Sequence, residues 1–221
     1  MQNEKSTEKI TLVFTLLCCL NFGIIAFTCG VIGLSIQEII NMNIARDFLE
    51  SLSAMPITPP YRSLLLAMGS YFIFVLLSYI SIIRELDNFP LAFVFIGEII
   101  LCIFIMYCMG FSSNAIVLLF IASVLASTTA MEFRFPFLIV GIIVYILFSS
   151  NIFSQLQIIS LSDFLSVYNT QTRLILGSLD SILNTLNIVV FVLFMFLLIY
   201  KEVKQGKQMR RMNDELRILN E

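Results

Sequence analysis

The sequence predicts an all-α, polytopic membrane bundle of about six transmembrane helices, followed by a helical, coiled-coil-like tail. Of the 221 residues, 59% are hydrophobic and 13% are charged, and the mean hydropathy is +0.96. A soluble domain has about 45–50% apolar and about 25% charged residues. Apolar runs of about 18 residues or more recur along the chain, as in helices that cross a bilayer. The sequence therefore indicates an integral membrane protein in contact with lipid.

Polar or proline-rich segments separate the apolar runs. Residues 55–62 (MPITPPYR) are rich in proline, residues 84–90 (RELDNFP) are charged, and residues 110–114 (GFSSN) are typical of a tight turn. Residues 131–136 (MEFRFP) carry two charges, whereas residues 151–181 are neither strongly apolar nor a clear loop. The predicted spans are residues 11–36, 62–83, 90–110, 114–131, 135–155 and 182–200.

The distribution of lysine and arginine predicts that both termini lie in the cytoplasm of a multi-pass cell-membrane protein. Cytoplasmic segments of membrane proteins are enriched in these residues. With six spans and a cytoplasmic N-terminus, ten of the thirteen positive charges lie on the cytoplasmic side, six of them in the tail. A seventh span, or a merged fourth and fifth span, would place the N-terminus on the outer side of the membrane and leave the tail in the cytoplasm.

Two segments outside the predicted spans are amphipathic. In residues 37–55 apolar side chains recur every four residues, and charged side chains take the other side, which predicts a helix on the outer interface. A packed extracellular connector is the alternative. Residues 161–180 are comparable, and together the two segments would form a small outer cap over the bundle.

Small residues form stripes on two predicted spans. Such stripes let helix backbones approach closely in lipid. We expect them to serve packing within one chain, with a dimer face as the alternative. They are Gly23, Ala26, Gly30 and Gly33 on the first span, and Ala122 and Ala126, continued by Ala130, on the fourth.

Glu98 is a carboxyl inside the third predicted span. It lies about eight residues, or about 12 Å, into that helix. A charged side chain in the membrane costs about 2.5–3.5 kcal/mol on insertion scales, so its presence needs a reason. One hypothesis is a signal- or ion-sensing carboxyl that faces the bundle interior. The other is a neutral carboxyl that forms a hydrogen bond with Ser, Thr or Tyr of a neighbouring helix.

Asp180, Asn184 and Asn187 recur at helical spacing at the start of the last predicted span. This stripe lies on the helix that leads into the tail, so a ligand that touches it would be able to move the tail. The alternative is that Asp180 lies above the membrane and the asparagines join helices through hydrogen bonds.

Composition excludes several classes of function. The chain contains no histidine, which excludes a histidine metal ligand, a histidine base and a phosphorylated histidine. The net charge of −2 argues against a nucleic-acid partner. No phosphate loop or hydrolase motif is present. We therefore predict no catalytic residue, no metal site and no cofactor in this chain.

The tail, residues 201–221, combines a basic band with an apolar seam. Lysines from Lys201 to Lys207 suit anionic headgroups at the inner membrane surface. Gly206 opposes helix formation by about 1 kcal/mol. Further on, an a/d spacing of 3, 4 and 3 residues predicts a dimeric coiled coil, with a solvated helix as the alternative. This seam consists of Met209, Met212, Leu216 and Leu219.

A polytopic region followed by the helical segment MNDELRILNE resembles the sensor part of Gram-positive sensor histidine kinases. The similarity is to the DesK-like/NarL-partner type or the peptide-pheromone-receptor type. It implies a transmembrane sensor bundle in residues 1–200 and a dimeric cytoplasmic stalk in residues 201–221. It also implies ATP, Mg²⁺ and a response regulator, but only through a catalytic domain that would follow. The histidine box and ATP-binding motifs of that family are absent from this chain.

The resemblance implies a conformational mechanism for a two-component system. A stimulus sensed at Glu98 would shift the last helix through Asp180, Asn184 and Asn187, and the stalk would change register. Two alternatives stay open. One is a six-span permease subunit of an ABC-type transporter or immunity system, and the other is a membrane scaffold whose tail binds a soluble partner.

Overall fold

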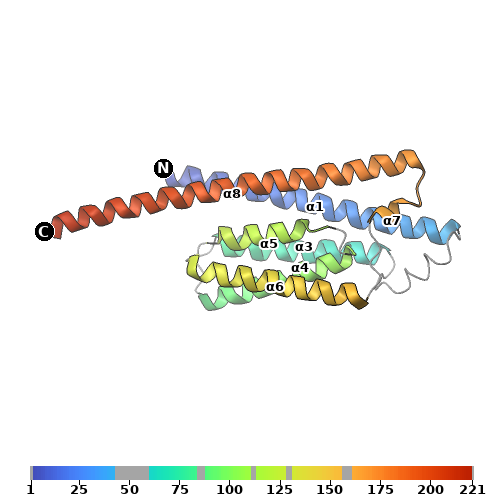
Figure 1. The fold of residues 1–221 in the computed structure, drawn as a ribbon, viewed down its shortest axis with the longest axis horizontal. Coiled ribbons are helices and arrows are strands. Elements are labelled where there is room, and N and C mark those ends of the chain that lie inside the picture. Colours follow the sequence, from blue (N-terminus) through green and yellow to red (C-terminus); the bar gives the residue numbers. More distant parts are fainter. Residues whose placement is uncertain are drawn as a thin grey trace.

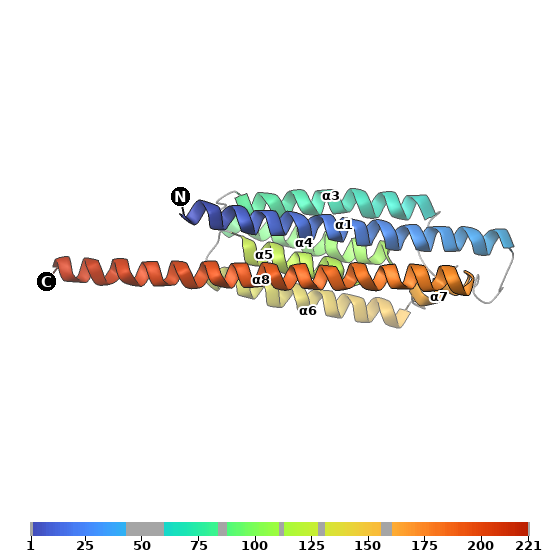
Figure 2. The same ribbon diagram turned by 90° about the horizontal axis from the view of Figure 1, so that it is seen from above.

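The computed structural model describes residues 2–42, 60–83, 88–110, 113–127, 131–155 and 161–220, and all its regular elements are α-helices. The helices form one elongated bundle from which the C-terminal part of α8 projects alone (Figures 1 and 2). We call the end that carries both chain termini the tail end, and the opposite end the far end. The helices are α1 (Gln2–Met42), α3 (Pro60–Ile83), α4 (Asn88–Cys108), α5 (Ala115–Ala126), α6 (Met131–Gln155), α7 (Leu161–Leu165) and α8 (Thr170–Asn220).

The predicted class of a multi-pass helical membrane protein is confirmed at this coarse level. Four helices are long and apolar enough to cross a membrane. The apolar part of α6 is shorter, and the 12 residues of α5 cover about 18 Å of a hydrocarbon core that is about 30 Å thick. The predicted count of six spans therefore stays a prediction. The four long segments are Lys9–Ile39, Leu64–Ile82, Pro90–Cys108 and Thr170–Arg217.

In the fourth predicted span, residues 114–131, the described helix is shorter than predicted. The helix α5 ends at Ala126, and residues 128–130, including Ala130, lie outside the described residues. Because α5 is apolar on all sides, it is suited to the interior of the bundle. It packs against α1, α3, α4, α6 and α8, and so occupies the centre of the described structure.

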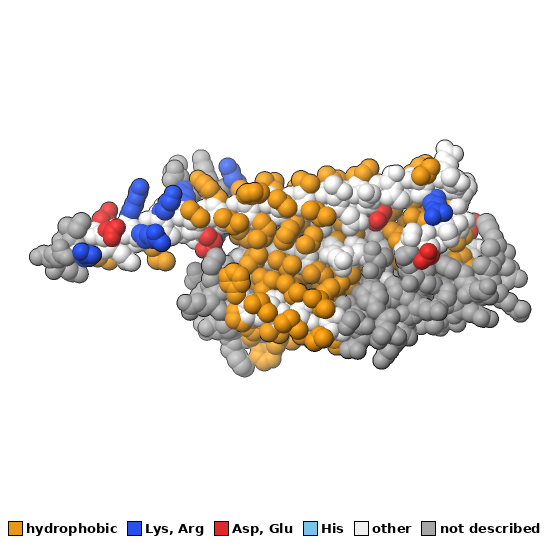
Figure 3. Space-filling model, in the orientation of Figure 1, with side chains coloured by type: hydrophobic (Ala, Val, Ile, Leu, Met, Phe, Trp, Pro, Cys, Tyr) orange, Lys and Arg blue, Asp and Glu red, His pale blue; other side chains and the backbone are white. Residues whose placement is uncertain are grey.

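Large apolar side chains cover the outside of the bundle as well as its core. Figure 3 shows a hydrophobic band over the middle of one face, with charged side chains gathered toward the two ends. A soluble fold rarely exposes a contiguous apolar surface of this kind. Exposed examples include Leu76 on α3, Ile143 on α6 and Val189 on α8. This pattern fits a bundle whose outer surface contacts lipid tails.

The helix α8 contains 51 residues and is continuous from Thr170 through Gly206 to Asn220. It begins twelve residues before the predicted start of the last span. Its first turn is capped by Asn169, whose side-chain oxygen accepts a 2.8 Å hydrogen bond from the Thr172 backbone N–H. At about 1.5 Å per residue the helix is about 76 Å long, which exceeds the thickness of a bilayer core.

The outer cap is only partly described. Residues 37–42 continue α1 and do not start a separate helix, and residues 43–55 lie outside the described residues. Residues 161–180 form the short helix α7 and the first turns of α8. Phe164 and Leu165 of α7 pack with Ile32 and Ile36 of α1 in a small apolar cluster at the far end. This cluster anchors the start of α8 to α1.

Candidate functional site: the polar contacts of α8

The α8 helix meets α1 through a pair of buried asparagines. The Asn21 side-chain N–H donates a 2.9 Å hydrogen bond to Oδ1 of Asn187 and a 3.0 Å bond to the Leu17 carbonyl oxygen. Asn21 is fully buried and Asn187 is 1% exposed. The Oδ1 atom of Asn21 has no hydrogen-bond partner. The pair therefore joins the first and last long helices of the bundle and leaves one buried acceptor free.

A second polar contact lies about one turn farther along α8 toward the far end. The Asn184 side-chain N–H donates to the carboxylate Oδ1 of Asp180 at 3.0 Å and to the Asp180 carbonyl oxygen at 2.9 Å. Oδ1 of Asn184 accepts a 3.2 Å hydrogen bond from the Ser113 hydroxyl. Of the predicted stripe, Asn184 and Asn187 thus have hydrogen-bond partners outside α8, whereas Asp180 is hydrogen-bonded to Asn184 of its own helix.

Ser113 belongs to a break between α4 and α5. Gly110 has a φ of 61°, a left-handed conformation that glycine adopts without steric cost. Ser113 is only 8% exposed. Its hydroxyl oxygen also accepts a 3.2 Å hydrogen bond from the Ala115 backbone N–H. Nearby, the Tyr145 hydroxyl of α6 donates to Oδ1 of Asn114 at 2.8 Å. Non-helical backbone among membrane helices needs such partners, because lipid offers none.

Glu98 is fully buried and lies apart from this network, among α3, α4 and α5. Its Oε1 accepts a 2.8 Å hydrogen bond from the Ser123 hydroxyl of α5. Its Oε2 has no hydrogen-bond partner. The structure does not bring Glu98 into contact with Asp180, Asn184 or Asn187. The helix α5 lies between Glu98 and the polar contacts of α8, because it packs on both α4 and α8.

The small residues differ in the contacts that they make. Ala122 is fully buried in the core, and Ala126 is partly buried beside it. Of the first stripe, Ala26 is half-buried and Gly33 is buried. A Cβ atom added at Gly23 or Gly30 would meet no described atom of another element within 4 Å. Close helix approach therefore does not require these two glycines.

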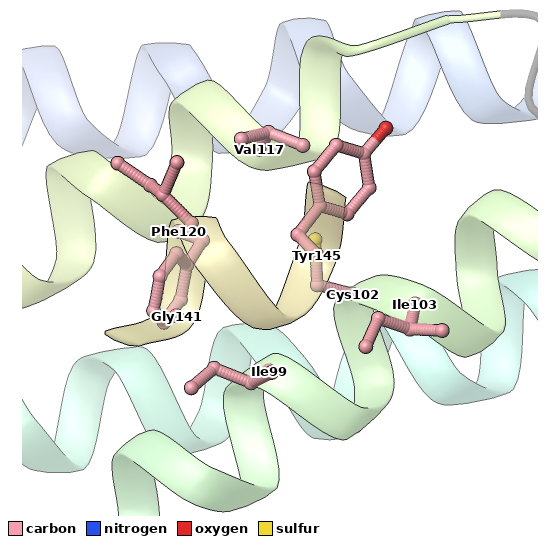
Figure 4. A pocket seen from close by; sticks show the side chains of 8 residues that line it. Ile99, Cys102, Ile103, Val117, Phe120, Gly141 and Tyr145 are labelled. Carbon is pink, nitrogen blue, oxygen red and sulfur yellow. The ribbon is translucent and has the colours of Figure 1, made fainter. Parts of the chain in front are cut away.

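The closest described approach at a glycine is at Gly141 on α6, which no sequence pattern indicated. A Cβ atom there would lie 2.8 Å from the Phe120 ring of α5 and 3.2 Å from Ile99 of α4. Figure 4 shows these residues beside a small apolar cavity of about 10 Å³, which Cys102 and Tyr145 also line. This volume is at most enough for one water molecule, and the mostly apolar lining offers it few polar partners.

A larger hollow opens between α1 and α3 on the outer surface, with a volume of about 320 Å³. Thr15 and Tyr79 meet at one end, where their hydroxyl oxygens are 2.6 Å apart. Phe22 packs against Tyr71 and Phe72 at the other end, with ring centroids 6.0 and 5.8 Å away. The hollow is mostly apolar and faces the surface that contacts lipid.

The predicted stalk residues lie on the part of α8 that projects beyond the bundle. Met209, Met212 and Leu216 are 64%, 54% and 57% exposed. Leu219 lies in the last turns of α8, and the structure does not describe its side chain. The seam thus has no covering element within the described residues, and the predicted coiled coil stays a prediction.

The direction in which the seam faces is a property that only the structure reveals. Met212 follows Phe194 by eighteen residues, and Leu216 follows Leu198 by the same separation, which is about five helical turns. Phe194 and Leu198 are buried against the bundle. In a straight α8 the seam therefore faces the side on which the bundle lies.

Sequence reasoning missed several residues of these contacts. Asn21 was a visible signal, since an amide inside an apolar run needs a partner, but the sequence could not name that partner. Ser113 and Ser123 carry no signal, because serine is common in membrane helices. Within the described ranges no group of three potential metal-ligating side chains was found. Comparison with family models, curated proteins and solved structures found no match for this chain.

Proposed function

We propose that this chain is a membrane-embedded signal-sensing part of a two-component sensor histidine kinase that passes a stimulus through α8 to a dimeric cytoplasmic stalk. The observation that carries the proposal is the continuity of α8 from Asp180, Asn184 and Asn187 to the exposed seam. One continuous helix therefore connects the polar contacts at the far half of the bundle with the tail.

The mechanism that we propose is a shift of α8 between two arrangements of its polar contacts. Asn187 holds α8 to α1, and Asn184 holds it to the break before α5 through Ser113. A stimulus that replaces either hydrogen bond favours a different position of the helix. Because α8 is continuous to Asn220, a shift or rotation at Asn187 is passed along the helix toward the tail.

Charge supports a cytoplasmic location of the tail in this proposal. Lys201, Lys204 and Lys207 follow the apolar part of α8, and Lys9 lies near the same end on α1. Cytoplasmic flanks of membrane helices are enriched in lysine and arginine. Histidine kinase activity, with its ATP, Mg²⁺ and response regulator, is proposed only for a catalytic domain that would follow residue 221.

The proposed stalk dimer pairs Met209, Met212, Leu216 and Leu219 with the same residues of a second copy. Cysteine cross-linking in native membranes tests it, in a background in which all five native cysteines are replaced by serine or alanine. Leu216→Cys and Leu219→Cys are expected to yield a disulfide-linked dimer on mild oxidation. Asp214→Cys and Arg217→Cys are matched controls, because these positions lie off the seam, and they are expected to yield far less.

The cross-linking result has a clear negative outcome. If neither Leu216→Cys nor Leu219→Cys gives more dimer than the two controls, the chain has no paired stalk and the sensor proposal fails. Expression of each variant, measured in the same membranes, shows that a low yield does not come from a lower amount of protein.

A further inference from the structure

The carboxyl of Glu98 lies in a polar enclosure built by three helices. Ser123 of α5 donates to Oε1 at 2.8 Å. Ser78 of α3 also faces the carboxyl, while its own hydroxyl donates to the Phe74 carbonyl oxygen at 3.0 Å. Glu98, Ser78 and Ser123 are each fully buried. A single acidic side chain is thus flanked by two serine hydroxyls and kept from lipid.

This enclosure suits a neutral carboxylic acid better than a carboxylate. A carboxylate has about four acceptor sites and normally gathers several donors. Here Oε1 accepts one hydrogen bond and Oε2 accepts none. Within the described part of the chain no lysine or arginine interacts with the group. A buried ion without a partner charge is strongly disfavoured.

We propose that Glu98, with Ser78 and Ser123, is a reversible proton-binding site in the centre of the bundle. In the proton-bound state Oε2 carries the hydrogen and Oε1 accepts from Ser123. In the proton-free state the new negative charge draws hydroxyl donors toward Oε2, which requires α3 or α5 to shift against α4. The ligand is therefore a proton, and its release changes the packing of three helices.

Two further serines extend the polar groups from Glu98 toward the tail end. Ser81 follows Ser78 by three residues on α3, so the two share one face of that helix, and Ser127, the residue directly after α5, follows Ser123 by four. Ser81 is fully buried and Ser127 is 3% exposed. Both helices run toward the tail end, as Figure 1 shows. Protons are therefore expected to reach Glu98 from the tail end.

Among the described residues, few other groups near the site titrate. Cys102, one turn farther along α4, is the titratable neighbour that interacts with Glu98. The helix α6 contributes Tyr145, which interacts with Cys102 and not with the carboxyl. From α3 and α5 the groups that face Glu98 are the serine hydroxyls. A pH-dependent change at this site is therefore assigned to Glu98.

Proton binding does not rest on the function that we propose for α8. Coupling between proton binding at Glu98 and a movement of α8 does rest on that proposed function. The helix α5 packs against both α4 and α8, so a shift of α5 on proton release would reach α8. A chain without a paired stalk would still bind the proton at Glu98.

The test uses dicyclohexylcarbodiimide, an apolar reagent that enters bilayers and modifies protonated carboxyl groups. The full chain in lipid vesicles is treated over a pH series, in equal concentrations of NaCl or KCl, and modified peptides are quantified by mass spectrometry. We expect modification at Glu98 that falls at least several-fold as the pH rises and is the same in both salts. Glu98→Gln should abolish this signal, and Asp180 serves as an internal comparison.

Three results would overturn the assignment. Modification that does not change with pH would make Glu98 a permanently neutral structural residue. Protection by NaCl but not by KCl would assign the site to a sodium ion. Failure to modify Glu98 counts against the proposal if infrared difference spectra also show no pH-dependent carboxylic acid band that disappears in Glu98→Gln. Ser123→Ala is expected to shift that band, because its hydroxyl donates to the same carboxyl.

Discussion

Asn21 on α1 and Asn187 on α8 form a 2.9 Å hydrogen bond in the interior of the bundle, although 166 positions separate them in the chain. Both side chains are almost completely buried. Their pairing sets how α8 sits on α1. It also explains why two polar residues persist in otherwise apolar runs.

Breaking this pair is predicted to destabilise the bundle modestly. Replacing either asparagine by alanine leaves a buried amide unpaired, and interhelical hydrogen bonds in membranes contribute about 0.6 kcal/mol on average, with a maximum of about 1.7. We expect a coupling energy in this range from the cycle of Asn21→Ala, Asn187→Ala and the double variant. Unfolding titrated with SDS in mixed micelles measures it.

A matched control for this cycle is Thr185→Ala. Thr185 is exposed, and its hydroxyl donates only to the Ser181 carbonyl oxygen of its own helix. It should show no coupling with Asn21→Ala. A coupling energy of zero between Asn21 and Asn187 would contradict the pairing.

The contact of Gly141 with Phe120 predicts that alanine is not tolerated well on this face of α6. Overpacking costs about 1–3 kcal/mol, and the higher helix propensity of alanine returns up to about 1. We therefore expect Gly141→Ala to lower the free energy of unfolding by about 1–2 kcal/mol. Gly69→Ala on α3 is the control, because no described atom of another element lies within 4 Å of its added Cβ. An equal effect of both substitutions would show that α5 and α6 do not meet closely at Gly141.

The hydrogen bond between Glu98 and Ser123 predicts different stabilities for two substitutions of Glu98. Glutamine keeps an oxygen that accepts from Ser123, so Glu98→Gln should change the free energy of unfolding by less than about 1 kcal/mol. Alanine leaves the Ser123 hydroxyl without this acceptor, and a buried unpaired group costs about 1–3 kcal/mol. The SDS titration compares the two variants at one pH. Equal destabilisation by glutamine and alanine would mean that a neutral acceptor does not suffice at this position.

The orientation of the seam predicts a role for Gly206 in the proposed stalk. In a straight α8 the seam faces the bundle side, where a second copy of α8 would collide with α1 and α5. Pairing therefore requires a bend between Leu198 and Met209, and Gly206 has the lowest helix propensity in that interval. We expect Gly206→Ala to reduce dimer formation by Leu216→Cys several-fold. Gln205→Ala is the control, and a higher dimer yield in Gly206→Ala would favour a straight paired helix.

Local patterns in the sequence were sufficient for the helical membrane class and for most helix positions. The apolar runs around residues 62–83 and 90–110 correspond to α3 and α4, because hydropathy and length alone identify a membrane helix. The 3–4 spacing in the tail is also a local property. The length of α5 was predicted less well, since the apolar run continues beyond Ala126 and contains no signal for the end of the helix.

The sequence by itself therefore determined the environment that each segment needs. It predicted apolar helices in lipid, a charged helical tail in water, and polar residues in the apolar runs that need hydrogen-bond partners. Only the tertiary structure decided which partners they have, that α5 is central, and that the tail seam faces the bundle side. The physical reason is that lipid is as apolar as a protein core. Val189 is 57% exposed and Val190 only 9%, yet hydropathy is the same for both. In a membrane protein the pattern of apolar residues does not distinguish the packed side of a helix from its lipid side.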